Sequence, residues 1–379
     1  MVNVSCTNKP DIDIPDVNNW KPSDDTIFYK GTTMSFASYL EDVGGLVYRE
    51  NGVSKDPYMS VKSSGGNMIR LLLEPEGFVR TPGMTVAGAP EIDWQLLPRV
   101  KEDMLRAKSA GLDVVLTLKP EKTVCRMWEG ITDHTSLGDT LYNWCYSVLD
   151  ELARQNTLPA IVAMGNEINA AFMSPADDYA NNIYDYERNV YFVNRGIAAV
   201  RAIEKKYNKK ILVAVHIFSP SNAEWWLDQH YDRGLTDFDI LAFSYYLNYP
   251  GHSMGNWVSF AQLGQWLKTY YGKRFMILET SYPYTLANAD DQANVYDAGL
   301  YESGGTTSPA KQRQYFLNLA KAVSDGEGLG MITWGSESLP TQAYIYANDT
   351  WGKGSSWDNN SYWDGQCNLH EGIKWMGDL

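Results

Sequence analysis

The feature that most constrains this chain is a short run of apolar, often β-branched residues that occurs eight times. Each of the first seven runs is followed by a stretch with apolar residues at helical spacing. The apolar runs lie at residues 27–29, 68–73, 113–118, 160–164, 210–215, 240–244, 275–278 and 330–334. Their near-continuous apolar character is typical of strands that are buried on both faces of a parallel sheet.

Helical patterns follow at residues 36–43, 94–110, 140–155, 183–207, 224–231, 260–271 and 310–324. This succession predicts an α/β protein with a single-domain (β/α)8 TIM barrel over residues 25–379, after a polar leader at residues 1–24. No G-x-G-x-x-G turn follows a strand, so the sequence does not favour a dinucleotide-binding fold. No apolar stretch reaches about 18 residues, so we expect no transmembrane helix.

The charge and the aromatic content narrow the class of ligand. The chain has 46 acidic and 32 basic residues, a net charge of −14, which argues against a nucleic-acid partner. It also has 13 Trp and 25 Tyr. Such a surplus suits a neutral, ring-shaped ligand such as a sugar, although an aromatic-rich core without any ligand is the alternative.

Four cysteines, Cys6, Cys125, Cys145 and Cys367, are widely spaced and form no C-x-x-C pair, which argues against a zinc or redox motif. One or two disulfides and four buried thiols both stay open. Residues 1–10 do not read as a signal peptide. We expect a protein that is secreted, periplasmic or a cell-surface lipoprotein, in which Cys6 once followed a signal sequence that has been removed. The alternative is that the N-terminal residues are a frayed tail with an incidental cysteine. We also expect a monomer.

Polar residues at the ends of the apolar runs are the candidate site, because a barrel of this kind has its active site at the carboxyl ends of its strands. The fourth run ends in Asn166 and Glu167, and the seventh ends in Glu279. A carboxylate at the tip of an apolar strand is costly unless it is paired or functional. Two carboxylates facing one cleft are the groups that glycoside hydrolysis needs, one to donate a proton and one to attack the anomeric carbon. Structural ion pairing with Arg or Lys is the alternative.

Other strand ends support the same site. Arg70, on the second run, can hold a carboxylate in its ionised form through charge-assisted hydrogen bonds. His216 ends the fifth run, and Tyr245 and Tyr246 end the sixth. Trp334 ends the eighth and offers a flat face on which a sugar ring can stack. Each residue alone has a structural alternative, but all of them fall at predicted strand ends.

Several segments together resemble glycoside hydrolase family 53 within the clan A retaining barrel enzymes. They are 162–168 (VAMGNEI), 243–246 (FSYY), 279–284 (ETSYPY), 308–312 (SPAKQ), 330–334 (GMITW) and 354–359 (GSSWDN). The resemblance runs from about residue 30 to the C-terminus. It implies an endo-β-1,4-galactanase acting on galactan side chains of pectin, with Glu167 as the acid/base and Glu279 as the nucleophile. It also implies that Asn166 contacts the sugar 2-hydroxyl and that Tyr245 lies near the nucleophile.

The sequence departs from that family around the expected subsites. After the third strand the family carries Asp-Phe-His-Tyr-Ser-Asp, whereas this chain has TLKPEK at 117–122. The family's Arg-Leu-Arg-Val-Trp becomes RLLLE at 70–74, and its Trp-Glu-Pro becomes WGSE at 334–337. Lys119 and Lys122 can favour an acidic or substituted glycan, or they can be solvated surface lysines.

The spacing of polar residues in one loop predicts a metal-binding site. Asn288, Asp290, Gln292 and Asn294 fall at alternate positions, a spacing that can wrap oxygen ligands around Ca²⁺. Bacterial members of the family that the chain resembles often bind calcium in this loop. Such an ion would be structural, and catalysis itself would require no cofactor. A plain polar loop is the alternative.

The sequence therefore predicts a retaining glycoside hydrolase that cleaves a β-linked plant polysaccharide, with an arabinogalactan endo-β-1,4-galactanase as the leading hypothesis. The alternatives are another clan A glycosidase, such as a mannanase, glucanase or arabinan-directed enzyme, and a carbohydrate-binding barrel without catalysis. An aldolase-like barrel has little support, because no strand ends in a lysine in an apolar setting suited to a Schiff base.

Overall fold

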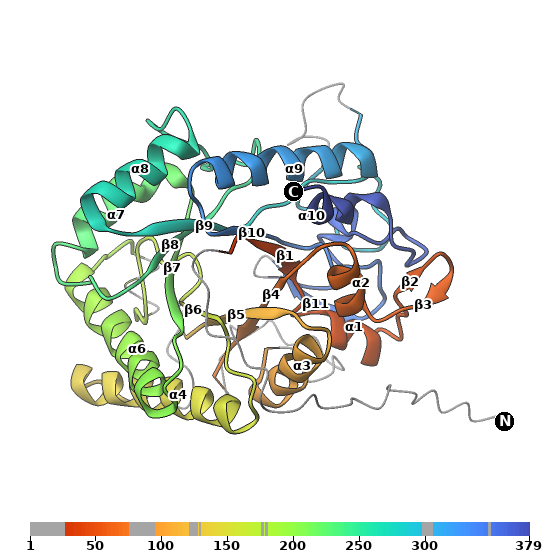
Figure 1. Ribbon diagram of the computed structural model, residues 1–379. Coiled ribbons are helices and arrows are strands. Elements are labelled where there is room, and N and C mark those ends of the chain that lie inside the picture. Colours follow the sequence, from red (N-terminus) through yellow and green to blue (C-terminus); the bar gives the residue numbers. More distant parts are fainter. Residues whose placement is uncertain are drawn as a thin grey trace.

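Eight parallel strands close into a barrel, and their order around the ring follows the chain (Figure 1). The computed structural model describes residues 27–75, 95–120, 128, 130–175, 178, 181–297, 306–347 and 350–379. The barrel strands are β1 (Tyr29–Thr33), β4 (Met68–Leu73), β5 (Asp113–Leu118), β6 (Ile161–Met164), β7 (Leu212–Phe218), β8 (Ile240–Ser244), β9 (Arg274–Glu279) and β10 (Gly330–Thr333). β1 pairs with both β4 and β10, which closes the ring. The predicted (β/α)8 fold is confirmed.

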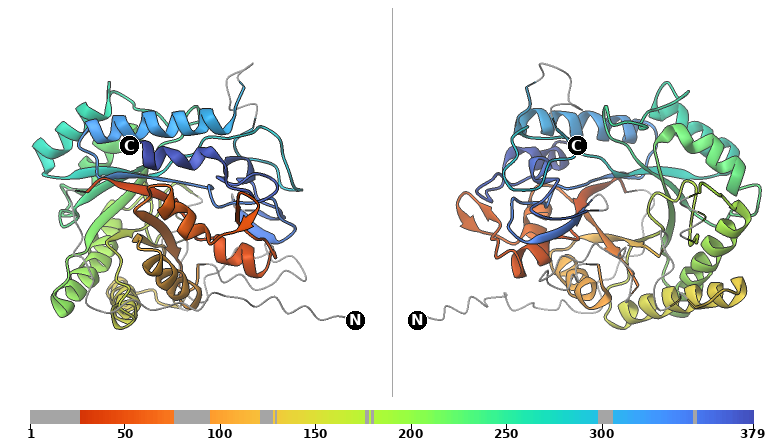
Figure 2. Two further views of the ribbon diagram at one scale, coloured as in Figure 1. Left: turned by 45° about the vertical axis from the view of Figure 1, so that its right-hand side comes forward. Right: turned by 180° about the vertical axis from the view of Figure 1, so that it is seen from behind.

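Helices surround the barrel (Figure 2). They are α1 (Ala37–Asp42), α2 (Pro57–Ser63), α3 (Leu97–Ser109), α4 (His134–Arg154), α6 (Tyr186–Tyr207), α7 (Ala223–His230), α8 (Phe260–Tyr271), α9 (Pro309–Asp325) and α10 (Trp375–Asp378). Two small hairpins, β2 (Arg49–Glu50) with β3 (Val53–Ser54) and β11 (Tyr344–Ala347) with β12 (Thr350–Lys353), lie outside the ring. The described residues also form single turns of 3-10 helix, which are η3 (Pro220–Asn222), η4 (Asp358–Asn360) and η5 (Glu371–Lys374).

Two elements differ from the sequence prediction for local reasons. α4 begins six residues earlier than predicted, because Asp133 caps it by accepting a hydrogen bond from the Ser136 amide at 2.8 Å. β1 begins later and continues through Gly31 to Thr33. A Cβ at Gly31 would lie 1.7 Å from the Met68 carbonyl oxygen, so glycine is needed where β1 approaches β4.

The strands bury both faces, which explains their continuous apolar runs. Side chains such as Val115, Ala163 and Ala242 fill the inside of the barrel. Their sequence neighbours, such as Leu116 and Val162, pack outward in the layer that includes the helices. Because successive residues of a strand alternate between these two layers, the layers also fix which strand-end residues face the mouth of the barrel.

A β-bulge interrupts this alternation in β9. Phe243 pairs with Ile277, but the next residue of β8, Ser244, pairs with Glu279, so Leu278 is an extra residue. Leu278 packs inside the barrel, and strict alternation would then turn Glu279 outward. The bulge instead re-aims the Glu279 side chain toward the interior, where its hydrogen-bond partners lie.

Within the described residues, no helix combines the length and apolar character needed to cross a membrane. Cys145 is buried and Cys367 is partly buried, and both are free thiols. The predicted leader at residues 1–24, with Cys6, lies outside the described residues, as do Cys125 and Lys122.

Candidate active site

A tight turn at the end of β6 presents the first candidate carboxylate. Gly165 has a φ of 84° and Glu167 a φ of 55°, both in the left-handed region. A Cβ at Gly165 would lie 2.4 Å from Cγ2 of Ile168, so the turn requires glycine there. The positive φ of Glu167 is a strained conformation of the kind that gathers at functional sites.

One buried arginine connects the two candidate strand ends. The Arg70 side chain is fully buried, and its Nη1 lies 2.5 Å from Oε1 of Glu279. Its Nη2 donates to Oδ1 of Asn166 at 2.6 Å, and its Nε donates to Oγ1 of Thr117 at 3.0 Å. The planar guanidinium thus fixes the ends of β6 and β9 relative to one another.

Glu279 lies in a setting that favours its ionised form. Its exposed fraction is 6%, and Oε2 accepts a hydrogen bond from the Tyr246 hydroxyl at 2.9 Å. Burial alone would raise the pKa of Glu279, but the Arg70 charge and the hydrogen bonds from Arg70 and Tyr246 hold it below its ordinary value. A buried, ionised carboxylate with this support is suited to nucleophilic attack.

Tyr246 lies within electrostatic reach of both candidate carboxylates. Burial raises the pKa of its phenol well above 10, and the charges of Glu279 and Glu167 raise it further. Glu167 is only partly buried, whereas Glu279 is nearly fully buried. The two acids therefore lie in different surroundings within electrostatic reach of the same phenol, and different surroundings are what give paired carboxylates different roles.

The structure places Tyr246, rather than Tyr245, at this carboxylate. The Tyr245 amide donates to the Glu279 carbonyl at 2.8 Å, but its ring packs edge-on against Phe260, with ring centroids 5.5 Å apart. The sequence singled out both tyrosines. Alternation along β8 separates them, because Ser244 and Tyr246 share the face that looks into the barrel.

His216 was predicted at a strand end, but β7 continues to Phe218, so His216 lies within the strand, in the same interior layer, and is buried. Its Nε2 is 3.0 Å from Oγ of Ser244, and its Nδ1 has no hydrogen-bond partner among the described residues. Burial, followed by the charge of Arg70, lowers the pKa of His216 to about 3, so its imidazole is neutral at physiological pH.

Aromatic rings form one wall of the site. Trp334 is partly exposed, and the Arg70 Cζ lies 5.8 Å from its ring centroid. Trp357 lies nearly perpendicular to Trp334, with centroids 6.4 Å apart, and its ring is 5.8 Å from that of Tyr246. Trp357 was not among the residues predicted from the sequence, where only its place in the C-terminal GSSWDN segment marked it.

The loop after β9 brings together part of the predicted metal set and one further acid. Asp358, from η4, is 2% exposed, and burial, followed by the charge of Asp290, raises its pKa to about 7. Oδ1 of Asp358 and Oδ1 of Asn294 have no hydrogen-bond partner among the described residues. A Cβ at Gly354 would lie 2.3 Å from Oδ1 of Asp290, so glycine leaves room for this carboxylate.

The other two predicted ligands, Asn288 and Gln292, hydrogen-bond to Asp290. The Asn288 side chain is exposed and donates from Nδ2 to the Asp290 carbonyl at 3.0 Å. Gln292 donates from its backbone amide to Oδ1 of Asp290 at 2.9 Å. The described residues contain no group of three or more His, Cys, Asp and Glu suited to a metal, so any ion here would depend on amide and carbonyl oxygens as well.

Glu337, three residues beyond Trp334, is a second buried acid that the sequence analysis did not single out. It is fully buried, and neither carboxyl oxygen has a hydrogen-bond partner among the described residues. Burial raises its pKa to about 8, despite nearby backbone amides and the charge of Arg70. Its carboxyl group is therefore protonated at neutral pH.

We expect Glu337→Gln to stabilise the protein at pH 8 and to leave its stability unchanged at pH 4.5. Between 4.5 and about 8 the unfolded chain releases a proton that the folded chain retains, so the unfolding free energy of the wild type falls as pH rises through this window. Gln avoids that loss, which amounts to about 1.4 kcal/mol per pKa unit. Urea unfolding at both pH values measures the difference, with the exposed Glu102→Gln as the control. An equal effect at both pH values would contradict the prediction.

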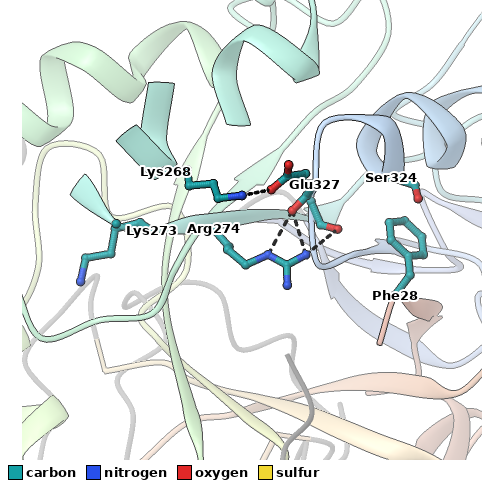
Figure 3. Close-up of a pocket in the computed structure, with 8 residues that line it drawn as sticks. Phe28, Lys268, Lys273, Arg274, Ser324 and Glu327 are labelled. Atoms are coloured by element: carbon teal, nitrogen blue, oxygen red, sulfur yellow. Dashed lines mark hydrogen bonds and ion pairs between the residues drawn. The ribbon is translucent and has the colours of Figure 1, made fainter. Parts of the chain in front are cut away.

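A cavity of about 460 Å³ opens at the opposite end of the barrel (Figure 3). The cavity is lined by Phe28 and Gly328, which lie just before β1 and β10, and by Arg274, the first residue of β9. Lys268 pairs with Glu327 at 2.5 Å, and Arg274 donates to the Glu327 carbonyl. Because barrel active sites lie at the carboxyl ends of the strands, this cavity is separate from the candidate active site.

The geometry agrees with comparisons against known proteins. A family model described as "Glycosyl hydrolase family 53" matches residues 29–376. The arabinogalactan endo-β-1,4-galactanase of Cellvibrio japonicus (strain Ueda107) is 31% identical over 356 residues, which cover 92% of this chain and 89% of that protein. The endo-β-1,4-galactanase of Bacillus subtilis (strain 168) is 23% identical, over 83% of this chain and 71% of that protein.

The chain also resembles solved structures of galactanase-type barrels. The GH53 catalytic domain of Ignisphaera aggregans superposes with a TM-score of 0.75 and 25% identity, over 96% of this chain and 98% of that chain. A fungal β-1,4-galactanase superposes with a TM-score of 0.71 and 19% identity, over 93% of this chain and 100% of that chain. At 19% identity, the second likeness bears on the fold alone.

Proposed function

The chain belongs to glycosyl hydrolase family 53 and is a glycoside hydrolase, and from this premise we propose that it is an endo-acting β-1,4-galactanase of plant arabinogalactan. The observation that carries the site assignment is the buried Arg70, which contacts both Glu279 and Asn166, the neighbour of Glu167. This arrangement supports a site built around two carboxylates at the mouth of the barrel. The substrate follows the printed activity of the Cellvibrio japonicus relative.

In the proposed mechanism, Glu279 attacks the anomeric carbon and Glu167 protonates the departing glycosidic oxygen. Glu279 is suited to attack because its pKa is lowered and its two oxygens are oriented by Arg70 and Tyr246. Glu167 then accepts a proton from water, which attacks the glycosyl-enzyme and releases a product of retained configuration. Glu167 is partly exposed, as a group that exchanges protons with water must be. These steps require no cofactor.

The remaining site residues are proposed to hold the sugar. Arg70 fixes the Asn166 amide through its oxygen, which leaves Nδ2 to donate to a hydroxyl of the bound galactose. Trp334 offers a partly exposed ring on which the sugar can stack. His216, held neutral and bonded to Ser244, supports the interior layer beneath the carboxylates without adding a charge.

A panel of β-1,4-galactan, arabinan, mannan and mixed β-glucan tests this function. We expect galacto-oligosaccharides of mixed short lengths from galactan and slower or no release from the others. Galactose alone would indicate exo action. Faster cleavage of another polysaccharide would favour a different clan A activity, and galactan binding without new reducing ends would favour a non-catalytic barrel.

We propose further that calcium binds between the β9 loop and η4, held by Asp290, Asn294 and Asp358. Two observations support a cation here. Oδ1 of Asp358 and Oδ1 of Asn294 have no hydrogen-bond partner among the described residues, and burial, followed by the charge of Asp290, raises the pKa of Asp358. The ion would tie the loop after β9 to the C-terminal segment, and it would take no part in the chemistry.

Calcium is therefore expected to raise the melting temperature of the wild type by several degrees, by binding the folded state only. Asp358→Asn should remove most of this increase, whereas Asp364→Asn, a neighbouring acid outside the proposed ligand set, should retain it. Differential scanning fluorimetry with chelator and with added Ca²⁺ measures both. An equal calcium effect in Asp358→Asn would contradict the proposed site.

We propose that the protein acts outside the cytoplasm, because a polysaccharide does not cross a membrane unaided, and that it is a monomer. Fractionation of the producing cells tests the first statement. Light scattering of the purified chain tests the second.

A further inference from the structure

A histidine in the loop after β8 packs against the phenol that supports the candidate nucleophile. The His252 ring meets the Tyr246 ring edge-on, with ring centroids 5.1 Å apart and an interplanar angle of 85°. Tyr246 is 6% exposed, and its hydroxyl donates to Oε2 of Glu279 at 2.9 Å. His252 was not among the residues predicted from the sequence. It is connected to the Glu279 carboxylate through one intervening side chain.

Hydrogen bonds hold the His252 ring and the backbone beside it. Nδ1 of His252 lies 3.3 Å from the Ser244 carbonyl oxygen, and because a carbonyl oxygen can only accept, Nδ1 carries the hydrogen and is the donor. The Ser253 amide donates to Oγ of Ser219 at 2.9 Å, and the same hydroxyl donates to the Ser253 carbonyl at 2.9 Å. His252 is thus tied to the last residue of β8, and its neighbour is tied to the residue that directly follows β7.

Further rings pack on both members of the pair. Phe218 and Tyr249 each pack against the His252 ring, with centroids 5.4 Å away. Trp357 packs against the Tyr246 ring, with centroids 5.8 Å apart. Aromatic pairs prefer particular edge-on or offset geometries. A His252 ring that is fixed by its own contacts therefore favours one orientation of the Tyr246 phenol.

The orientation of this phenol matters because its hydrogen bond acts on the charge of Glu279. Burial raises the pKa of Glu279, whereas the Arg70 charge and the hydrogen bonds from Arg70 and Tyr246 hold it below its ordinary value. His216 also faces this carboxylate, but its pKa of about 3 leaves it uncharged at neutral pH. Burial lowers the pKa of His252 too, so its ring acts on the site by contact and adds no charge at neutral pH.

We propose that His252 is a positioning residue of the reaction: its ring holds the Tyr246 phenol in the orientation from which the hydroxyl donates to Glu279. The inference rests on the proposed retaining mechanism, in which Glu279 is the nucleophile. His252 itself touches neither the substrate nor the reacting atoms. It therefore affects the chemical step only through Tyr246.

Two substitutions separate the ring of His252 from its hydrogen bond. His252→Phe retains an edge-on ring and loses the Nδ1 donor, whereas His252→Asn retains a donor at the Nδ1 position and loses the ring. Neither leaves the Ser244 carbonyl without a partner, because that oxygen also accepts from the Ser219 amide at 2.9 Å. Each substitution is made alone and together with Tyr246→Phe. The measured quantities are kcat and kcat/KM on a β-1,4-linked galacto-oligosaccharide as functions of pH.

We expect His252→Asn to lower kcat about tenfold and His252→Phe to lower it about threefold at most. The acid limb of kcat/KM reports the pKa of the nucleophile in the free enzyme. In His252→Asn it should move to higher pH by about half a unit, because the hydrogen bond that lowers this pKa is weakened. In the Tyr246→Phe background, the two substitutions at position 252 should give rates within about twofold of each other, since the hydroxyl through which they act is absent.

His134→Asn is the matched control, because it removes an edge-on contact between a histidine and Phe192 where α4 meets α6. It should change neither kcat nor the acid limb. Equal kcat values and equal acid limbs in His252→Asn and His252→Phe would overturn the proposal. So would a larger loss in His252→Phe than in His252→Asn, or a difference that persists in the Tyr246→Phe background.

Urea unfolding tests the same contact without any substrate. Because the folded pKa of Glu279 is lowered, its ionised form stabilises the protein above the unfolded pKa, and this stability is lost as pH falls through the folded pKa. Both variants lack the imidazole, so His252→Asn should lose less stability on acidification than His252→Phe, and Glu279→Gln should abolish the difference. An equal loss in both variants would contradict the positioning role. A wild type that leaves galactan uncleaved would count against the galactanase function, while this comparison would still test His252.

Discussion

Glu279→Gln should lower kcat on β-1,4-galactan by at least about 10⁴-fold, because no other described group is placed to form the glycosyl-enzyme. The substitution keeps the shape of the side chain and an oxygen that can accept from Arg70 or Tyr246. The melting temperature should therefore change by only a few degrees. Initial-rate measurements of reducing ends and thermal unfolding of the same preparations give both numbers.

Azide distinguishes the roles of the two carboxylates. In Glu279→Ala, azide can enter where the carboxylate stood and attack an activated aryl galactoside, to give an α-galactosyl azide of inverted configuration. In Glu167→Ala, a substrate with a good leaving group still forms the glycosyl-enzyme, and azide then gives a β-galactosyl azide. The opposite stereochemistry in the two variants would reverse the proposed roles, and full activity of Glu279→Gln would end the assignment.

Arg70→Met should lower kcat by about 10²-fold or more and should destabilise the fold by about 3–5 kcal/mol, because it leaves the buried carboxylate of Glu279 without its cation. Asn166 and Thr117 lose their donor at the same time. Arg70→Lys should have a kcat and a stability between those of the wild type and of Arg70→Met, since a single ammonium cannot contact all three partners in the guanidinium geometry. Urea unfolding and kcat on galactan measure the two effects separately.

The double variant Arg70→Met/Glu279→Gln separates stability from activity. Removing both charges should recover much of the lost stability while leaving the enzyme inactive.

The pH dependence of stability gives a second check of the Arg70–Glu279 pair. Because the folded pKa of Glu279 is lowered, its pairing stabilises the wild type above the unfolded pKa, and this stability is lost as pH falls through the folded pKa. Arg70→Met should lack this acid-side loss, and an unchanged profile would contradict the pairing.

Much of the fold was predictable because parallel strands buried on both faces leave continuous apolar runs in the sequence. β4, β5 and β8 have the bounds that the apolar runs predicted. β1 was placed too early, because Gly31 and the threonines after it do not look like a buried strand. The hairpins outside the ring, β2–β3 and β11–β12, were not predicted, since each of their strands has only two to four residues.

The site was predictable in its composition and less so in its geometry. Strand-end position found Glu167 and Glu279, and Arg70 was found as the one charged residue inside an apolar run, where the structure places it within β4 rather than at its end. Strand-end position did not separate Tyr245 from Tyr246. Asp358 and Glu337 were missed because an isolated acid in a polar segment gives no sign that it is buried. Burial is decided by residues distant in the sequence, such as the Asp290 loop that packs against Asp358.

The bulge in β9 has a consequence for how this site can change over evolution. The direction of the Glu279 carboxylate depends on the number of residues before it, since Leu278 is the extra one. A substitution along β9 leaves this number unchanged. Loss or gain of one residue there would turn the carboxylate toward the helix layer in a single event, so the direction of Glu279 is more sensitive to the length of this strand than to its sequence.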